Sequence, residues 1–128
     1  MRVFAACLLG MIAVAMNTAC ADAPRKDSTS LIRGCRATMV AIDEQKGIPS
    51  TFEAGYCVGL VAGVLQTSFH ASGQLLGEKV CIPGDYNKLL VMQKLVELSY
   101  TSPSIKAAEP FAIVILAIRH TYPCTSGG

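Results

Sequence analysis

The spacing of hydrophobic positions predicts a first helix that ends near Lys46. After Asp27-Ser28, which can cap a helix, apolar or small residues recur at intervals of three and four. This recurrence is typical of one face of an amphipathic helix. Gly47 is suited to a C-terminal stop. The face consists of Leu31, Cys35, Thr38, Met39 and Ile42.

A second helix is predicted from about Thr51 to Phe69, because Ser50-x-x-Glu53 forms a capping box behind Pro49. Three glycines occur in it at four-residue spacing, although each weakens a helix by about 1 kcal/mol relative to alanine. At 100° per residue they share one side, and Cys57 lies nearly opposite. The other positions are largely apolar, which indicates a buried helix. We therefore expect the glycines to admit a neighbouring backbone; they are Gly55, Gly59 and Gly63.

Two further helices are predicted after a loop of small and polar residues at 71–79. Asp85 or Asn87 can cap a third helix that runs to about Tyr100, and a break follows at 101–105. Pro110 is suited to the first position of a fourth helix. Residues 111–118 are uniformly apolar and have the periodicity of a buried strand as much as of a helix. No partner strand is evident, so an all-α fold, a small bundle of about four helices, is the prediction.

The first 23 residues have the pattern of a cleaved export signal. Arg2 precedes an uncharged, mostly apolar run, and Ala21-Asp22-Ala23 matches the small-x-small cleavage pattern. The apolar run is too short for a comfortable membrane span. An alternative is lipid anchoring through Cys20, although Asn17 stands where such sites normally have an apolar residue. We expect residues 1–23 to be removed and residues 24–128 to form a single domain in the periplasm.

The charge of the chain bears on whether its partner is a nucleic acid or a membrane. The formal net charge is +2, and no Lys/Arg run exceeds two residues, which gives no argument for nucleic acid or an anionic membrane surface. The apolar run around the glycines is too short for a membrane dimer of the GxxxG type. Neither a membrane span nor a nucleic-acid partner is expected.

Four cysteines remain after removal of the signal, and disulfides are the default for an exported chain. They are Cys35, Cys57, Cys81 and Cys124. Zinc favours closer pairs such as C-x-x-C, so no metal is expected. In an antiparallel helix pair, residues equidistant from the turn lie side by side. This favours Cys35–Cys57 and Cys81–Cys124, whose midpoints fall on predicted turns. Cys57–Cys81 with Cys35–Cys124 remains open.

The sequence provides little for catalysis. His70 and His120 are its only histidines, and no local motif places a nucleophile beside either. A Cys/His nucleophile would need a free thiol. No glycine-rich loop follows a strand, so no phosphate site or cofactor is predicted. We do not expect an enzyme.

The order of several motifs resembles the Rap/Tai family of type VI secretion amidase immunity proteins. They are Gly55-Tyr56-Cys57-x-Gly59-x-x-x-Gly63-Val64, Cys81-Ile82-Pro83, Ser102-Pro103, Pro110 and Tyr122-Pro123-Cys124. The resemblance covers about residues 28–124. Departures occur at Ser102, Leu90, Phe111 and Tyr122, where the family usually has His, Gln, a small residue and Phe.

The resemblance implies a largely helical periplasmic protein that binds a peptidoglycan amidase toxin and blocks its active site, acting as a homodimer without a cofactor. The alternative is a small exported helical binding or chaperone-like protein without a toxin partner.

Sequence reasoning places the binding surface in the loop between the second and third helices. Exposed leucines there would be unusual without a partner. The alternative is that they fold back over the core. The candidate toxin-binding residues are Phe69, His70, Gln74, Leu75, Leu76, Glu78 and Lys79.

Overall fold

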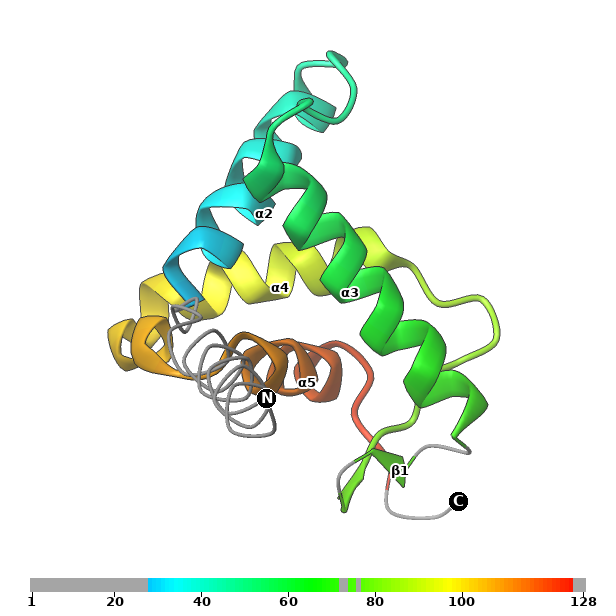
Figure 1. Ribbon diagram of the computed structural model, residues 1–128. Helices are drawn as coiled ribbons and strands as arrows, with labels where there is room; N and C mark the ends of the chain where they lie inside the picture. Colours follow the sequence, from blue (N-terminus) through cyan, green and yellow to red (C-terminus); the bar gives the residue numbers. More distant parts are fainter. Residues whose placement is uncertain (1–27, 72–73, 76, 126–128) are drawn as a thin grey trace, which may run out of the picture.

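The computed structural model describes residues 28–71, 74–75 and 77–125. The predicted export signal, Cys20, the predicted Asp27 cap and Leu76 therefore lie outside the described residues. The described chain contains four α-helices, one 3-10 helix and a two-stranded hairpin, which confirms the all-α prediction (Figure 1). In order they are α2 (Ser28–Asp43), α3 (Phe52–His70), β1 (Gln74–Leu75), β2 (Glu78–Lys79), α4 (Lys88–Thr101), η1 (Pro103–Ala107) and α5 (Pro110–Thr121).

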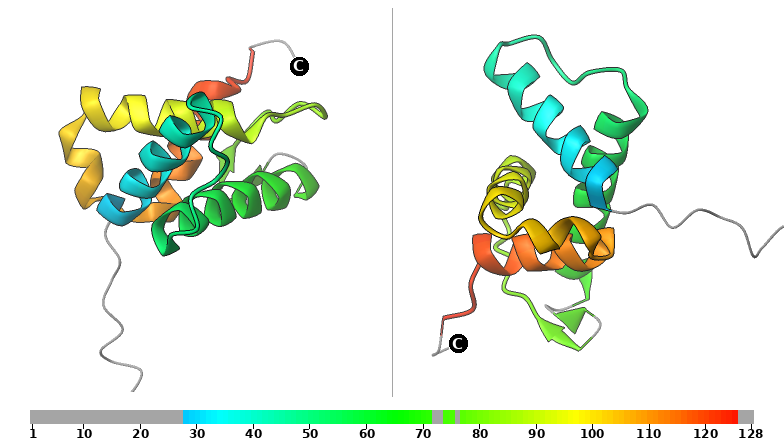
Figure 2. Two further views of the ribbon diagram at one scale, coloured as in Figure 1. Left: turned by 90° about the horizontal axis from the view of Figure 1, so that it is seen from above. Right: turned by 90° about the vertical axis from the view of Figure 1, so that its left-hand side faces the viewer.

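The helices form two pairs that cross each other. Helices α2 and α3 diverge from their connecting turn as the arms of a V, and α4 and α5 run antiparallel across the opening (Figures 1 and 2). The core lies where the pairs meet. Its largest fully buried side chains come from all four helices and include Leu31, Leu65, Met92, Leu95, Ile113 and Ile118.

Helix boundaries follow local chemistry. Asn87 caps α4, because its side chain accepts a hydrogen bond from the Leu89 N–H at 2.9 Å. Pro110 begins α5, as predicted.

The turn after α2 contains two residues with positive φ, Gln45 at 58° and Gly47 at 74°. Helix α2 ends at Asp43, before the predicted end at Lys46, because Gln45 adopts the left-handed conformation and the Lys46 N–H donates to the Ala41 carbonyl oxygen at 2.8 Å. Gln45, not Gly47, therefore ends the helix, and Gly47 lies in the turn beyond it.

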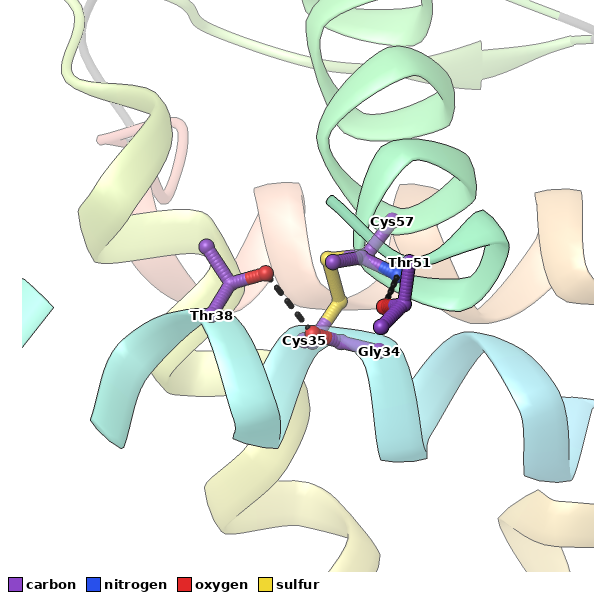
Figure 3. Close-up of a disulfide and its surroundings, with 6 residues drawn as sticks. Gly34, Cys35, Thr38, Thr51 and Cys57 are labelled. Atoms are coloured by element: carbon purple, nitrogen blue, oxygen red, sulfur yellow. Dashed lines mark hydrogen bonds between the residues drawn. A yellow bond between two sulfur atoms is a disulfide. The ribbon is translucent and has the colours of Figure 1, made fainter. Parts of the chain in front are cut away.

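The capping box predicted for α3 is wrong by one residue. Thr51, not Ser50, is the N-cap, and its Oγ1 accepts a hydrogen bond from the Ala54 N–H at 3.2 Å (Figure 3). Glu53 instead forms an ion pair with Arg33 of α2. The side chain that was expected to close the box thus links two helices at the surface.

Both predicted disulfides are present. Cys35–Cys57 joins α2 to α3 with a Cα–Cα distance of 5.2 Å, and Cys81–Cys124 joins the segment after β2 to the segment after α5 at 5.1 Å. Cys35 and Cys57 are fully buried. The inner disulfide, Cys35–Cys57, joins the middle of α2 to the first turns of α3 (Figure 3).

The predicted role of the α3 glycines in packing within the chain is wrong. Gly55, Gly59 and Gly63 are exposed, and a Cβ built on any of them has no neighbour within 4 Å. The close approach occurs at Gly34 of α2, where a Cβ would lie 1.9 Å from the Glu53 carbonyl oxygen. Burial of Cys57 on the opposite side of α3 is confirmed.

Two segments expected to lack regular structure have it. In the 71–79 loop, β1 and β2 pair antiparallel, with Gln74 opposite Lys79 and Leu75 opposite Glu78. Gly77, in the connecting turn, has a φ of 80°. The break after α4 contains η1, and its buried Ile105 contributes to the core.

Candidate functional site

The sequence-predicted binding residues lie at one end of the molecule. Phe69 and His70 end α3, and the hairpin begins four residues later at the same end (Figure 1). We call this region the hairpin end, formed by Phe69, His70 and the strands β1 and β2. The turn between α2 and α3 lies at the opposite end of the molecule.

Aromatic side chains form the base of the hairpin end. Phe69 is 44% exposed. Its ring makes an edge contact with His70, with centroids 5.6 Å apart, and a tilted contact with Tyr86, with centroids 6.0 Å apart. Tyr86 precedes α4 and is half-buried. The Phe69 ring is thus held in place on one side and open to solvent on the other, which suits an anchor for a partner.

The hairpin itself presents polar side chains. Gln74 and Lys79 are exposed and lie opposite each other in the pairing of β1 with β2. Leu75 and Glu78 form the other pair of the register. The structure therefore places Phe69, His70, Gln74 and Lys79 at one end of the molecule, and their role in binding stays a prediction. The Leu75 side chain and Leu76 lie outside the described part of the chain. Their role, covering the core or contacting a partner, therefore stays a prediction.

Two links hold the segment that follows the hairpin. Val80 is 2% exposed and packs in the core directly after β2. Cys81 is bonded to Cys124. The hairpin end is therefore attached to the body of the protein at its start, through α3, and at its finish, through Val80 and the disulfide. Such double attachment limits the conformational entropy that binding would remove.

A second exposed surface lies on α3, and the sequence analysis did not identify it as a site. The outward face of α3 carries the three glycines, and beside them is a hollow of about 250 Å³ lined by Gly59, Leu60, Gly63, Val64, Thr67 and Phe111. Phe52, 66% exposed, stacks on Tyr56 one helical turn away, with centroids 6.1 Å apart. The glycine spacing marks this face in the sequence, but the sequence analysis interpreted it as a site of close packing within the chain.

The outer face of α2 holds a larger, shallow hollow of about 560 Å³, whose lining includes Arg33, Arg36, Val40, Glu44 and Glu53. Its charges have partners within the chain. Arg33 pairs with Glu53, and the Arg36 guanidinium lies 4.7 Å from the centroid of the Tyr100 ring. These two interactions join α2 to α3 and to α4. Because both are exposed, each contributes about 1 kcal/mol or less to stability.

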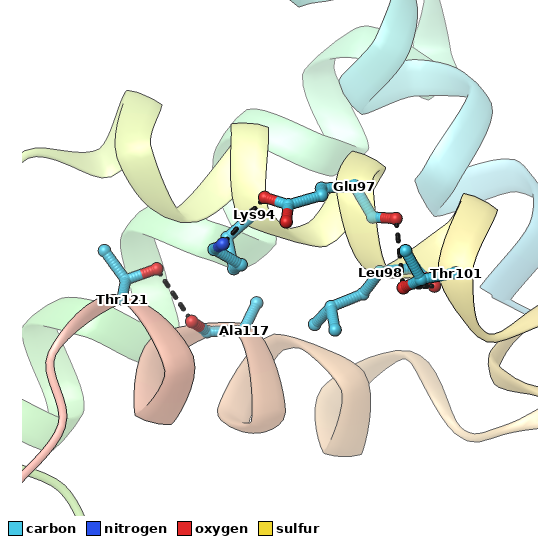
Figure 4. A network of polar contacts seen from close by, with 6 residues as sticks. All are labelled: Lys94, Glu97, Leu98, Thr101, Ala117 and Thr121. Atoms are coloured by element: carbon cyan, nitrogen blue, oxygen red, sulfur yellow. Dashed lines mark hydrogen bonds and ion pairs between the residues drawn. The ribbon is translucent and has the colours of Figure 1, made fainter.

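Polar interactions near the line where α4 and α5 pack lie within each helix. Lys94 pairs with Glu97 at 2.7 Å, and the Thr101 and Thr121 hydroxyls donate to carbonyl oxygens of their own helices (Figure 4). His120 lines a hollow of about 270 Å³ at this edge with Leu90 and Gln93. The second histidine, His70, lies on a different helix at the hairpin end.

Within the described residues, no group of three His, Cys, Asp or Glu side chains is arranged to hold a metal ion. No helix in that part of the chain combines the length and apolar character needed to cross a membrane. The two disulfides are compatible with an exported protein.

Comparison of the chain with protein-family models, with curated proteins and with solved structures finds no match.

Proposed function

We propose that this protein is a periplasmic immunity protein of the type VI secretion system, which binds a peptidoglycan amidase toxin and occludes its active site without catalysing a reaction. The observation that carries the proposal is the pairing of the four cysteines. The Gly-Tyr-Cys, Cys-Ile-Pro and Tyr-Pro-Cys motifs, which underlie the resemblance to the Rap/Tai family, supply three of the bonded cysteines.

The hairpin end is the proposed toxin-binding surface. It combines a half-exposed, supported phenylalanine with polar side chains from two strands, in a region attached at both ends. An inhibitor that blocks a cleft gains affinity when its binding residues are already ordered, because fewer side chains and loops must be immobilised. A stapled helical bundle carrying such a surface suits occlusion of an active site.

Rescue of growth tests the function. The full chain, with its signal, is co-expressed with periplasmic amidases encoded beside its gene, and lysis is followed. Rescue by the intact chain, together with a stable complex in size-exclusion chromatography, is the expected result. Lysis in the presence of the folded, exported protein with every neighbouring amidase would contradict the proposal and favour a binding or chaperone-like role.

The surface is tested by a matched pair of substitutions. Phe69→Ala removes the supported ring of the hairpin end and should weaken toxin binding by about 2 kcal/mol, roughly thirtyfold in Kd. Ile48→Ala removes an apolar side chain that is 53% exposed at the opposite end and should leave the Kd unchanged. Equal effects of the two variants would contradict the assignment of the hairpin end.

The same resemblance implies a homodimer, and we include this in the proposal. Light scattering of the mature protein alone should give twice the monomer mass. A monomer at micromolar concentration would remove the dimer from the proposal and leave the toxin-binding role to be judged by the rescue.

A further inference from the structure

The two disulfides differ in their access to solvent. Cys35 and Cys57 are each 0% exposed and belong to the hydrophobic core. Cys81 is exposed, and Cys124 is half-buried. Thiol–disulfide exchange requires a thiolate to reach one sulfur of the bond, so access controls its rate. The outer disulfide, Cys81–Cys124, is therefore open to exchange in the folded protein, whereas the inner disulfide is shielded.

The outer disulfide joins two segments without helix or strand. Residues 80–87 connect β2 to α4, and residues 122–125 follow α5. A further contact links them: the Tyr122 hydroxyl accepts from the Asn87 N–H at 2.7 Å and donates to the Asn87 carbonyl oxygen at 3.2 Å. Both of these hydrogen bonds are exposed to solvent. The Tyr122 and Ile82 side chains are also partly buried against the hydrophobic core. Once the disulfide opens, these exposed hydrogen bonds and the partial burial of Tyr122 hold the C-terminal segment against the start of α4.

The inner disulfide fixes a different region. It ties α2 to α3 inside the core, where Gly34 and Glu53 are also in contact. Its two cysteines lie in α2 and α3, outside residues 80–87 and 122–125. Opening the outer disulfide should thus loosen the connection after the hairpin and the C-terminal segment while leaving the crossing of α2 and α3 in place.

We propose that Cys81–Cys124 is a thiol-exchange site that a dithiol reductant opens selectively in the native protein, releasing the C-terminal segment from residues 80–87. The reductant thiolate attacks the sulfur of Cys81, the more exposed residue of the pair. The Sγ–Sγ bond breaks, and Cys124 leaves as a thiolate that takes up a proton. The second thiol of the reductant then resolves the mixed disulfide and frees Cys81. Two electrons pass to the protein, and the reductant becomes a disulfide.

This inference goes beyond the proposed immunity function and needs no toxin for its test. The oxidised mature protein is treated with dithiothreitol under native conditions, quenched at intervals with an alkylating reagent and mapped by peptide mass spectrometry. Cys81 and Cys124 should be labelled at least about tenfold faster than Cys35 and Cys57, because exchange at the shielded pair must await opening of the core. Labelling of all four cysteines at one rate, or of Cys35 and Cys57 first, would overturn the proposal.

A second measurement follows the conformational consequence. Hydrogen exchange of the selectively reduced protein, and of the Cys81→Ser/Cys124→Ser variant, should rise in residues 80–87 and 122–125. Protection of the buried amides in α2 and α3 should be retained. Loss of protection in all helices together would show that the outer disulfide holds the whole fold, and would overturn a local release.

The variant Tyr122→Phe is the control for the hydrogen bonds between Tyr122 and Asn87. It removes both hydrogen bonds to Asn87 but keeps the disulfide. In the oxidised protein it should change exchange at residues 80–87 only slightly, whereas in the reduced protein it should add to the release. A Tyr122→Phe variant that releases the segment while Cys81–Cys124 is intact would overturn the assignment of the disulfide as the controlling link.

Discussion

Gly34 of α2 lies directly against the backbone of Glu53 in α3, so closely that a Cβ on Gly34 would be 1.9 Å from the Glu53 carbonyl oxygen. The adjacent Cys35–Cys57 disulfide, with a Cα–Cα distance of 5.2 Å, joins the two helices at the same crossing. Helix packing at this point therefore depends on the absence of one side chain and the presence of one covalent bond.

Gly34→Ala should destabilise the protein by about 1–3 kcal/mol or more, because the obstacle is main chain and the helices must separate to admit a methyl group. The matched variants Gly55→Ala and Gly59→Ala should stabilise it by about 0.5–1 kcal/mol each, since those sites are open and alanine favours a helix. Urea unfolding measures all three. A destabilising Gly59→Ala in the monomer would contradict the exposed position of that glycine.

Thr51→Ala should lower the free energy of unfolding by about 1 kcal/mol, because it removes the oxygen that accepts from the Ala54 N–H. Ser50→Ala, at the neighbouring exposed position, should change it by less than about 0.5 kcal/mol. Thermal unfolding of the two variants distinguishes the observed cap from the capping box that the sequence indicated. The reverse order of effects would restore Ser50 as the cap.

Two buried serines should respond in opposite directions to alanine. Ser68 Oγ in α3 is fully buried and has no hydrogen-bond partner among the described residues, so Ser68→Ala removes an unsatisfied polar group and should be neutral or stabilising by about 1 kcal/mol. Ser99 in α4 is 3% exposed, and its hydroxyl donates to the Val96 carbonyl oxygen at 2.6 Å. Ser99→Ala should cost about 1 kcal/mol. Denaturant midpoints at constant slope give the comparison, and similar losses at both sites would indicate a partner for Ser68.

Removal of the inner disulfide should be the more damaging, although it closes the shorter loop. Loop-closure entropy alone gives about 3–4 kcal/mol for each bond, at separations of 22 and 43 residues, with the longer loop slightly favoured. The Cys35→Ala/Cys57→Ala variant also loses the packing of two buried sulfur atoms, about 1 kcal/mol each if a sulfur counts as a methylene. Cys81→Ser/Cys124→Ser loses less packing because its site is more exposed. Equilibrium unfolding under identical conditions ranks them, and a larger loss for the outer pair would show that loop length decides.

The helices and the cysteine pairing were predictable because their signals are local. Asn87 and Pro110 mark helix starts by their own chemistry, and the spacing from each cysteine to the nearest turn indicates its partner. The hairpin was not predictable in the same way, because strands of two residues are too short to show alternation. Gly77, with its positive φ, was the one local signal of its turn.

The glycines show where periodicity stops being informative. Periodicity identifies the side of α3 on which Gly55, Gly59 and Gly63 lie, but a helix that is apolar nearly all round does not reveal which side is buried. Gly34 has no comparable spacing, and its signal is its place beside Cys35 on the buried face of an amphipathic helix. Part of the candidate site, the support of Phe69 by Tyr86, joins residues 17 positions apart through packing that no local pattern encodes.

Within the described residues, each disulfide joins consecutive cysteines, and neither loop encloses or overlaps the other. Under the proposed export with removal of residues 1–23, a chain delivered amino-terminus first would oxidise its first pair before Cys81 emerges and its second pair afterwards, with no wrong partner available at the first step. Native connectivity then follows from the order of arrival, and the slow reshuffling of mismatched bonds, which takes seconds to hours, is bypassed.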